Sequence, residues 1–164
     1  MSTLSSRLVA ATMCASLGLW VLEAVGGPTE VAQVKSRQDK FREMGGALKS
    51  ITDELKKGKV DWDNTVLPNA QTLKDRSDYL LKWFPKGTGP EGGVKTYALP
   101  AIWQNNDDFV RLGKAAQAEA VKLNQVALTR DPSALKVQAE AMGKACMACH
   151  NSYRSPDYGN ESDE

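Results

Sequence analysis

The chain has 164 residues, enough for one domain with a sizeable hydrophobic core. Its 21 lysines and arginines nearly balance its 20 aspartates and glutamates, which argues against the strongly basic surface typical of nucleic-acid-binding proteins. Apolar residues make up 41% of the chain and charged residues 25%, the proportions of an ordinary soluble globular domain.

The N-terminal region differs from the rest of the sequence. Residues 1–7 are polar and basic, residues 8–22 are apolar and uncharged, and the glycines and proline of residues 26–28 would interrupt a continuing helix. This order is typical of a secretory signal peptide, and the apolar run is shorter than the roughly 20 residues of a membrane span. We therefore predict a signal peptide over residues 1–27. An uncleaved N-terminal anchor is the alternative, because no clean A-x-A cleavage site follows the apolar run.

Two amphipathic helices are predicted next, over residues 29–57 and 62–84. In each, residues of one face recur at alternating steps of three and four. The first series is Val34, Arg37, Phe41, Met44, Leu48, Ile51 and Leu55. The second series is Val66, Ala70, Leu73, Ser77, Leu80 and Phe84. Gly58 is expected to cap the first helix, and Pro68 must lie in the first turn of the second helix or kink it.

Two further amphipathic helices are predicted in the second half of the chain. The third covers residues 100–129, and the fourth starts at Pro132 with Asp131 as its N-cap. The inward series of the third is Ile102, Asn106, Phe109, Gly113, Ala116, Ala120, Leu123 and Ala127. The inward series of the fourth is Leu135, Ala139, Met142, Cys146, Cys149 and Tyr153.

The lengths of the connections predict how these helices are arranged. Few residues separate the first helix from the second and the third from the fourth, which makes each pair antiparallel. The middle connection, residues 85–100, is rich in glycine and proline and can cross one end of a bundle. We predict an all-α fold, an antiparallel four-helix bundle over residues 28–156. Residues 157–164 are polar and acidic, and a disordered tail is expected there.

The fourth helix ends with a cysteine pair followed by a histidine. Residues 146–150 are Cys-Met-Ala-Cys-His, the C-x-x-C-H signal for covalent attachment of a c-type haem. Residues three apart lie on one helix face, about a turn from each other, so both thiols can bond to the same porphyrin. The adjacent histidine can then place an imidazole nitrogen on the iron. The sequence therefore predicts one haem c, attached through Cys146 and Cys149, with His150 as the axial iron ligand.

Other uses of this cysteine pair fit the sequence less well. A zinc site needs about four ligands, but the third cysteine, Cys14, lies in the predicted leader and His150 is the only histidine. A thioredoxin-like pair would lie at a helix start after a strand, and a disulfide at this spacing on a helix would be strained. The single histidine also excludes a second histidine as the other axial ligand. Methionine is then the remaining common strong ligand.

Three methionines are candidates for the opposite side of the iron. Met147 lies between the two cysteines and cannot reach across the ring, and Met142 lies one turn before Cys146 on the same helix. Met44, on the inward face of the first helix, can ligate the iron or simply fill the core. Arg37 lies on that same face, where a charge must be paired. A haem propionate is the expected partner, and the alternative is that the guanidinium extends to solvent.

Small residues lie on the inward face of the third helix. They are Gly113, Ala116 and Ala120. Small side chains at these positions can make room for a flat cofactor or can allow close helix packing. The sequence leaves both alternatives open.

Three sequence blocks resemble cytochrome c prime and its close low-spin relatives, which are four-helix-bundle haem proteins. The resemblance spans roughly residues 30–155. The blocks are residues 37–46 (RQDKFREMGG), residues 83–89 (WFPKGTG) with 98–103 (ALPAIW), and the C-x-x-C-H sequence with Tyr153 and Arg154. A haem signal at the C-terminal end, followed by this Tyr-Arg pair, is more specific than the signal alone.

The resemblance implies roles that spacing alone does not assign. Low-spin members carry an iron-ligating methionine four residues after the helix-one arginine, and high-spin members carry a bulky apolar residue there. The residue at this position is Phe41. The resemblance therefore implies five-coordinate iron, with Phe41 over the vacant side and Met44 unused. It also implies that Arg154 lies close to the side occupied by His150, and it supports Arg37 as a propionate partner.

The function implied by the resemblance is that of a periplasmic haem protein that is not an enzyme. Such a protein transfers single electrons, and five-coordinate iron binds small neutral gases such as NO or CO. The alternative is a six-coordinate electron carrier that uses Met44 as a ligand and does not readily bind gases. A peroxidase-type enzyme would need a distal acid–base group, and no second histidine supplies one. The implied partners are a redox protein that the sequence does not identify and a second copy of the chain in a homodimer, with no nucleic acid.

Overall fold

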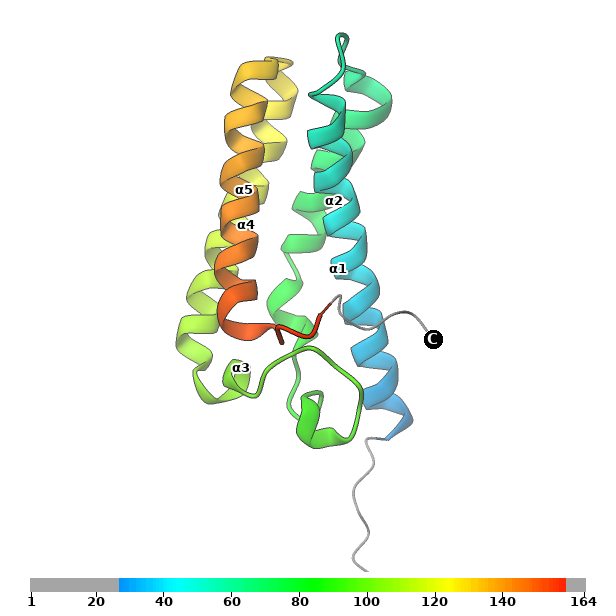
Figure 1. Ribbon diagram of the computed structural model, residues 1–164, viewed down its shortest axis with the longest axis vertical. Coiled ribbons are helices and arrows are strands. Elements are labelled where there is room, and N and C mark those ends of the chain that lie inside the picture. Colours follow the sequence, from blue (N-terminus) through cyan, green and yellow to red (C-terminus); the bar gives the residue numbers. More distant parts are fainter. Residues whose placement is uncertain (1–26, 159–164) are drawn as a thin grey trace, which may run out of the picture.

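The computed structural model describes residues 27–158, which form an antiparallel bundle of four long helical segments (Figure 1). One side consists of α1 (Pro28–Glu54) and α2 (Leu67–Ser77), and the other of α4 (Asn106–Thr129) and α5 (Pro132–Tyr153). The short α3 (Ala101–Gln104) precedes α4. The predicted all-α four-helix bundle is confirmed.

The predicted leader lies outside the described residues except for Gly27, which precedes the first turn of α1. Within residues 27–158, none of the helices combines the length and apolar character that a membrane span requires.

The turn between α4 and α5 follows the predicted capping pattern. The side chain of Asp131 accepts hydrogen bonds from the backbone N–H groups of Ser133 and Ala134, at 2.8 and 3.2 Å. Pro132 occupies the first turn of α5. A backbone N–H there would have no partner within the helix, so proline costs no hydrogen bond at this position. Arg130 adopts the left-handed conformation, with φ at 57°, and closes α4.

The end of α1 differs from the prediction. The helix stops at Glu54 and not at a Gly58 cap. The carboxylate of Glu54 is buried and accepts hydrogen bonds from the backbone N–H of Asp61 at 2.9 Å and from Lys57 Nζ at 2.5 Å. These bonds fold the connection back over the helix end, so the helix terminates before the glycine is reached.

The predicted helix over residues 62–84 is divided into three parts. It begins as the π-helical turn η1 (Trp62–Val66), continues as α2 with Pro68 in its first turn, and ends as the 3₁₀ helix η2 (Leu80–Trp83). The carbonyls of Ser77 and Asp78 accept hydrogen bonds from Gln117 Nε2 of α4, at 2.9 and 3.4 Å. The bundle thus uses carbonyl groups that a continuous helix would have bonded within itself.

The predicted helix over residues 100–129 is also interrupted. Asn105 separates α3 from α4 with φ at −118° and ψ at 54°, and its carbonyl oxygen lies 3.3 Å from the hydroxyl of Tyr153. Asn106, which the periodic series placed inward, is exposed at the first position of α4. The inward series resumes at Phe109, which is buried.

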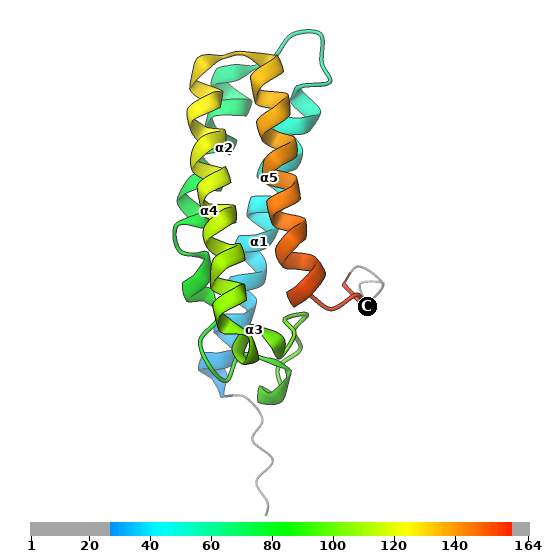
Figure 2. The same cartoon turned by 90° about the vertical axis from the view of Figure 1, so that its left-hand side faces the viewer.

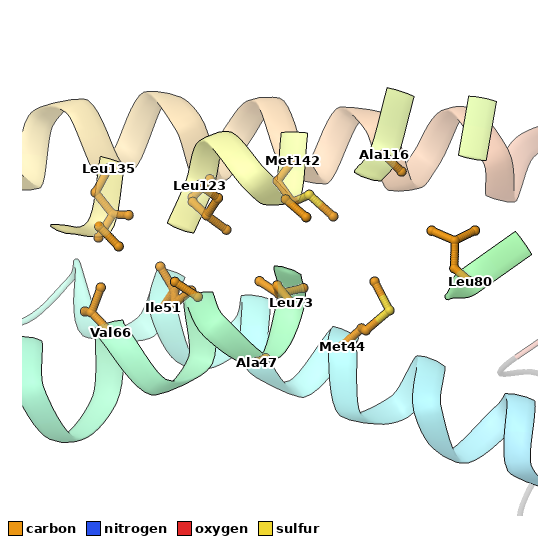
Figure 3. Packing of buried hydrophobic residues seen from close by; sticks show 14 of the residues in the cluster. Met44, Ala47, Ile51, Val66, Leu73, Leu80, Ala116, Leu123, Leu135 and Met142 are labelled. Atoms are coloured by element: carbon orange, nitrogen blue, oxygen red, sulfur yellow. The ribbon is translucent and has the colours of Figure 1, made fainter. Parts of the chain in front are cut away.

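The described residues form two core clusters. The larger extends from the end of the bundle where the short connections lie. The smaller lies where α3, α4 and α5 meet the crossing segment, and it consists of Ala98, Ile102, Phe109 and Tyr153. Figure 3 shows side chains of the larger cluster meeting from both helix pairs. The fully buried apolar members include Ile51, Val66, Leu73, Leu123, Leu135 and Met142. Burial of each large aliphatic side chain contributes about 1.5–3 kcal/mol. All six belong to the predicted inward series, whereas the buried Ala47 and Trp83 do not, so periodicity identified most of the core.

The helices are not equally close to one another. α4 packs extensively against both α2 and α5, whereas α1 and α5 make few contacts with each other. Residues 85–100 cross the open end of the bundle, as predicted, and contain the 3₁₀ turn η3 (Pro90–Gly92). The space between α1 and α5 is therefore bounded at that end by the crossing segment.

The chain after α5 packs against the crossing segment (Figure 2). Ala98 and Arg154 form an isolated antiparallel bridge, with the Ser155 N–H donating to the Tyr97 carbonyl at 2.8 Å. The ring of Tyr158 lies 5.2 Å from that of Tyr97, centroid to centroid. Residues 157 and 158 thus form a turn against the crossing segment. The predicted disordered tail stays a prediction, and its residues 159–164 lie outside the described residues.

The small residues of α4 have different roles. A Cβ at Gly113 would lie 2.4 Å from Cδ2 of Leu81 and 3.2 Å from its Cγ, so the glycine allows Leu81 to pack directly on the α4 backbone. Ala120 is fully buried in the core. Ala116 belongs to the same core cluster and also lines the cavity between α1 and α5. The small residues of α4 thus serve close packing and, at Ala116, border the cavity as well.

We predict that Gly113→Val lowers the free energy of unfolding by about 1–3 kcal/mol, because the branched side chain would overpack against Leu81. Urea unfolding followed by circular dichroism would measure the loss. Ala115→Val on the exposed side of α4 is the control, with an expected loss of no more than about 0.7 kcal/mol from helix propensity. Leu81→Ala should relieve part of the Gly113→Val defect, and equal losses at positions 113 and 115 would contradict the close approach.

Candidate haem site

A cavity of about 1260 Å³ lies between α1, α5 and the crossing segment. It exceeds the roughly 300–1,000 Å³ of common small-molecule pockets. Residues of α1 form one wall and residues of α5 form the opposite wall. The seven predicted site residues all line it: Arg37, Phe41, Met44, Cys146, Cys149, His150 and Arg154.

The α5 wall carries the cysteine pair and the histidine. Cys146 and Cys149 are free and partly buried, one helical turn apart on the face that begins with Met142. Burial raises the pKa of both thiols, that of Cys149 to about 11, so both are protonated at neutral pH. Burial, reinforced by the charge of Arg154, lowers the pKa of His150 to about 4. The imidazole is therefore neutral, the form in which a histidine ligates a metal.

The α1 wall carries Phe41 and Met44. The Phe41 ring is half-buried and packs edge-on against Trp83, with centroids 5.2 Å apart, and 6.0 Å from Phe84. Met44 is buried, and Figure 3 shows its side chain directed from α1 toward the interior, where Met142 enters from the opposite side. Both candidate residues of the first helix thus border the same cavity.

The charged side chains among the described residues that line the cavity are all cationic. They are Arg37, Arg42, Lys95 and Arg154, and no aspartate or glutamate is among these lining residues. The remainder of the lining is mostly apolar, aromatic or glycine. A flat apolar group with carboxylate substituents fits this combination, and two thiols and a neutral imidazole on one wall fit covalent attachment and iron ligation. The residues present therefore suit a haem.

Arg37 is buried, with 3% of its surface exposed. Its guanidinium donates hydrogen bonds to the carbonyl of Trp83 at the end of η2, and to the Thr88 carbonyl and the Thr88 and Thr96 hydroxyls of the crossing segment. The alternative in which this side chain extends to solvent is wrong. Pairing with a propionate stays a prediction. The sequence did not identify Thr88 and Thr96 as acceptors, because they lie in a segment without periodicity. The one available signal was that a buried arginine requires nearby acceptors.

The end of α5 is fixed by contacts that the sequence did not indicate. The Tyr153 hydroxyl donates to Asp108 Oδ2 at 2.8 Å, and Arg111 pairs with the same carboxylate at 2.5 Å. These two partners, Arg111 first, hold the pKa of Asp108 below its usual value. The guanidinium carbon of Arg154 lies 4.4 Å from the centre of the Tyr158 ring. A tyrosine at the end of a predicted helix was the only available signal for this anchoring.

Comparison with known proteins connects this site to a family. The family model described as Cytochrome C' matches residues 32–154. Cytochrome c' from Alcaligenes xylosoxydans xylosoxydans is 33% identical over 74% of this chain and 91% of its own length. Cytochrome c' from Rhodospirillum rubrum is 29% identical over 76% of this chain and 82% of its own.

Solved structures show the same similarity. Cytochrome c' from Thermochromatium tepidum superposes with a TM-score of 0.71 at 28% identity, covering 77% of this chain and 96% of that one. A cytochrome c' with a ligand-controlled dimer dissociation gives a TM-score of 0.72 at 26% identity, covering 79% and 99%. The nitric oxide complex of a cytochrome c prime variant from Alcaligenes xylosoxidans gives 0.68 at 28% identity, covering 77% and 95%. The chain belongs to the cytochrome c' family of electron-transfer haem proteins, and its cofactor is a covalently bound haem c.

Proposed function

We propose that haem c is attached through Cys146 and Cys149, with His150 as the axial ligand, and that the protein carries single electrons and binds small neutral gases. One observation carries this proposal: the two thiols and a neutral imidazole share one wall of a cavity whose opposite wall presents Phe41. When bound, haem c supplies a one-electron iron couple and a coordination position for a ligand. The residues of the chain determine what reaches that position.

Phe41 governs access from the α1 side. Its ring offers no hydrogen-bond donor, so bound O2 would gain no stabilisation, and an apolar wall disfavours water and anions. NO and CO are neutral and need no such donor. Because Phe41 is packed against Trp83 and Phe84, its ring must move within an aromatic cluster when a ligand enters. The nitric oxide complex of the Alcaligenes relative supports this part of the proposal.

A six-coordinate carrier is the second candidate, and one observation favours it. Met44 lines the same cavity as Phe41 and is directed inward, one turn further along α1 (Figure 3). A thioether ligand would occupy the position that a gas needs and would raise the reduction potential. Phe41 stands at the position where high-spin members of the family carry a bulky apolar residue, so we favour five-coordinate iron.

The proposal extends to the setting of the protein. Export by the predicted signal peptide would place the protein in the periplasm, and the cavity would carry out no catalytic turnover because the chain has no second histidine to act as a distal acid–base group. A homodimer is proposed by similarity to the relative with a ligand-controlled dimer dissociation. Haem attachment, iron coordination and the charge of Arg37 are each accessible to a separate experiment.

We expect Cys146→Ser with Cys149→Ser to abolish the haem that stays on the polypeptide in a denaturing gel, because each thiol forms one covalent link to the porphyrin. Peroxidase-based haem staining of the gel measures this. Cys14→Ser is the matched control and should leave the stain unchanged, since that cysteine lies in the predicted leader. Retained staining in the double variant would contradict the attachment.

We expect the visible spectrum of the reduced protein to change on addition of CO, because five-coordinate iron has a free position. Met44→Ala should leave the spectrum before CO addition unaltered if its thioether is not a ligand. Met142→Ala, on the opposite helix, controls for loss of a buried methionine. A sharp low-spin spectrum that CO does not alter, and that Met44→Ala abolishes, would establish the six-coordinate alternative.

We expect Arg37→Leu to lower the reduction potential, because a nearby positive charge stabilises the reduced state, which holds one more electron. Loss of the cation should also raise the pKa of the paired propionate, so the pH dependence of the potential should move to higher pH. Spectroelectrochemical titration between pH 5 and pH 9 measures both. Arg76→Leu is the control, since Arg76 is exposed, pairs with Glu43 and does not line the cavity. A potential that stays constant in Arg37→Leu would contradict the propionate pair.

A further inference from the structure

The guanidinium of Arg37 is held by one segment of the chain. Nη1 donates to the Trp83 carbonyl at 3.2 Å and to Thr88 Oγ1 at 3.0 Å. Nη2 donates to the Thr88 carbonyl at 2.9 Å and to Thr96 Oγ1 at 2.9 Å. The guanidinium carbon also lies 4.6 Å from the centre of the Phe84 ring, a cation–π distance. These contacts come from Trp83, the last residue of η2, and from residues between η2 and α3.

The two threonine hydroxyls are oriented as acceptors for Arg37. Thr88 is fully buried, and its hydroxyl donates its one hydrogen to the Pro85 carbonyl at 2.8 Å, which leaves its lone pairs for Nη1. Thr96 Oγ1 accepts a second hydrogen bond, from the backbone N–H of Ala98 at 3.2 Å. Each hydroxyl is therefore fixed in direction by a backbone group of its own segment.

Within the described residues, the charge of Arg37 is stabilised by neutral oxygens and not by a carboxylate. All four acceptors are carbonyl or hydroxyl oxygens, and no aspartate or glutamate within residues 27–158 pairs with the guanidinium. Burial lowers the pKa of Arg37 to about 10, so the group still carries its charge at neutral pH. A full positive charge thus remains at the cavity wall, where the surrounding dielectric screens it less than water would.

We propose that Thr88 and Thr96 are positioning residues that hold the charge of Arg37 at the cavity wall and thereby raise the reduction potential of the haem. The proposal rests on the proposed electron-transfer function. Without the hydroxyls, the long side chain of Arg37 can turn toward solvent, where its charge is screened. The crossing segment then does more than close the end of the bundle, because it sets the electrostatic potential inside the cavity.

The test is a double-mutant cycle on the haem-loaded protein. Thr88→Val combined with Thr96→Val removes both hydroxyls with little change in side-chain shape. The pair is prepared in the wild-type background and in Arg37→Leu, and the midpoint potential of each protein is measured by spectroelectrochemistry. We expect the potential to fall in the wild-type background and to show no further fall in the Arg37→Leu background, because the threonines act only through the arginine.

A purely structural role gives a different result. If the threonines only hold the segment in place, the same shift appears in both backgrounds, which would overturn the proposal, as would an unchanged potential in the wild-type background. Arg37→Gln provides a second neutral background in case Arg37→Leu does not fold. Thr72→Val is the matched control, because the Thr72 hydroxyl donates only within its own helix, to the Pro68 carbonyl at 3.0 Å.

Failure of the proposed function is recognised independently. Haem staining and the CO-dependent spectrum are recorded for the wild-type protein before the cycle is measured. Absence of attached haem would refute the attachment and not the role of the threonines. Attached haem with normal spectra and a potential that does not respond to Thr88→Val and Thr96→Val would refute the threonine proposal alone.

Discussion

The structure depends on how the crossing segment is bonded to two helices that hardly touch each other. On one side it accepts three hydrogen bonds from Arg37 of α1, at Thr88 and Thr96. On the other side it pairs with the end of α5 through Ala98 and Arg154. Since α1 and α5 make few direct contacts, this segment fixes their separation at the open end. The cavity is the space that these connections enclose. At the other end, close packing through the core holds the helices together, so the bundle is tight at one end and open at the other.

Much of the fold was predictable because the helices obey local rules. Spacing by three and four identified the buried faces, and Asp131 with Pro132 marked the start of α5, since these signals depend only on neighbours in sequence. The errors arose where contacts outside the helical repeat intervene. Gln117 donates to a carbonyl at the end of α2 from 40 residues away, and the buried Glu54 carboxylate accepts from the N–H of Asp61, seven residues on, where α1 ends before Gly58. Helix propensity encodes neither contact, so it could not predict these interruptions.

The site residues likewise fall into those that a local sequence pattern predicted and those that depend on contacts between distant segments. The α5 wall follows from a contiguous sequence signal, because the chemistry of attachment requires both thiols and the histidine within one turn. Arg37 was predicted inward from periodicity, but its acceptors were not, because Thr88 and Thr96 lie in a segment with no repeating pattern. The spacing also could not separate Gly113, which meets Leu81, from Ala116, which borders the cavity. Those roles depend on which neighbour faces each position.

The proposed function assigns three properties of the site to three parts of the chain. In that proposal the α5 wall provides attachment, Phe41 and Met44 of α1 control what reaches the opposite side, and the crossing segment holds the charge that faces the cofactor. The chain carries nearly equal numbers of acids and bases, yet no acid is found among the described residues that line the cavity. This exclusion reflects a physical requirement, since a carboxylate in a region of low dielectric would oppose both the propionates and the added electron. Phe41 shares α1 with Arg37 and packs against Phe84, whose ring the Arg37 guanidinium also contacts. A substitution at position 41 is therefore expected to disturb both coordination and the placement of that charge, whereas the proposed attachment on α5 should be retained.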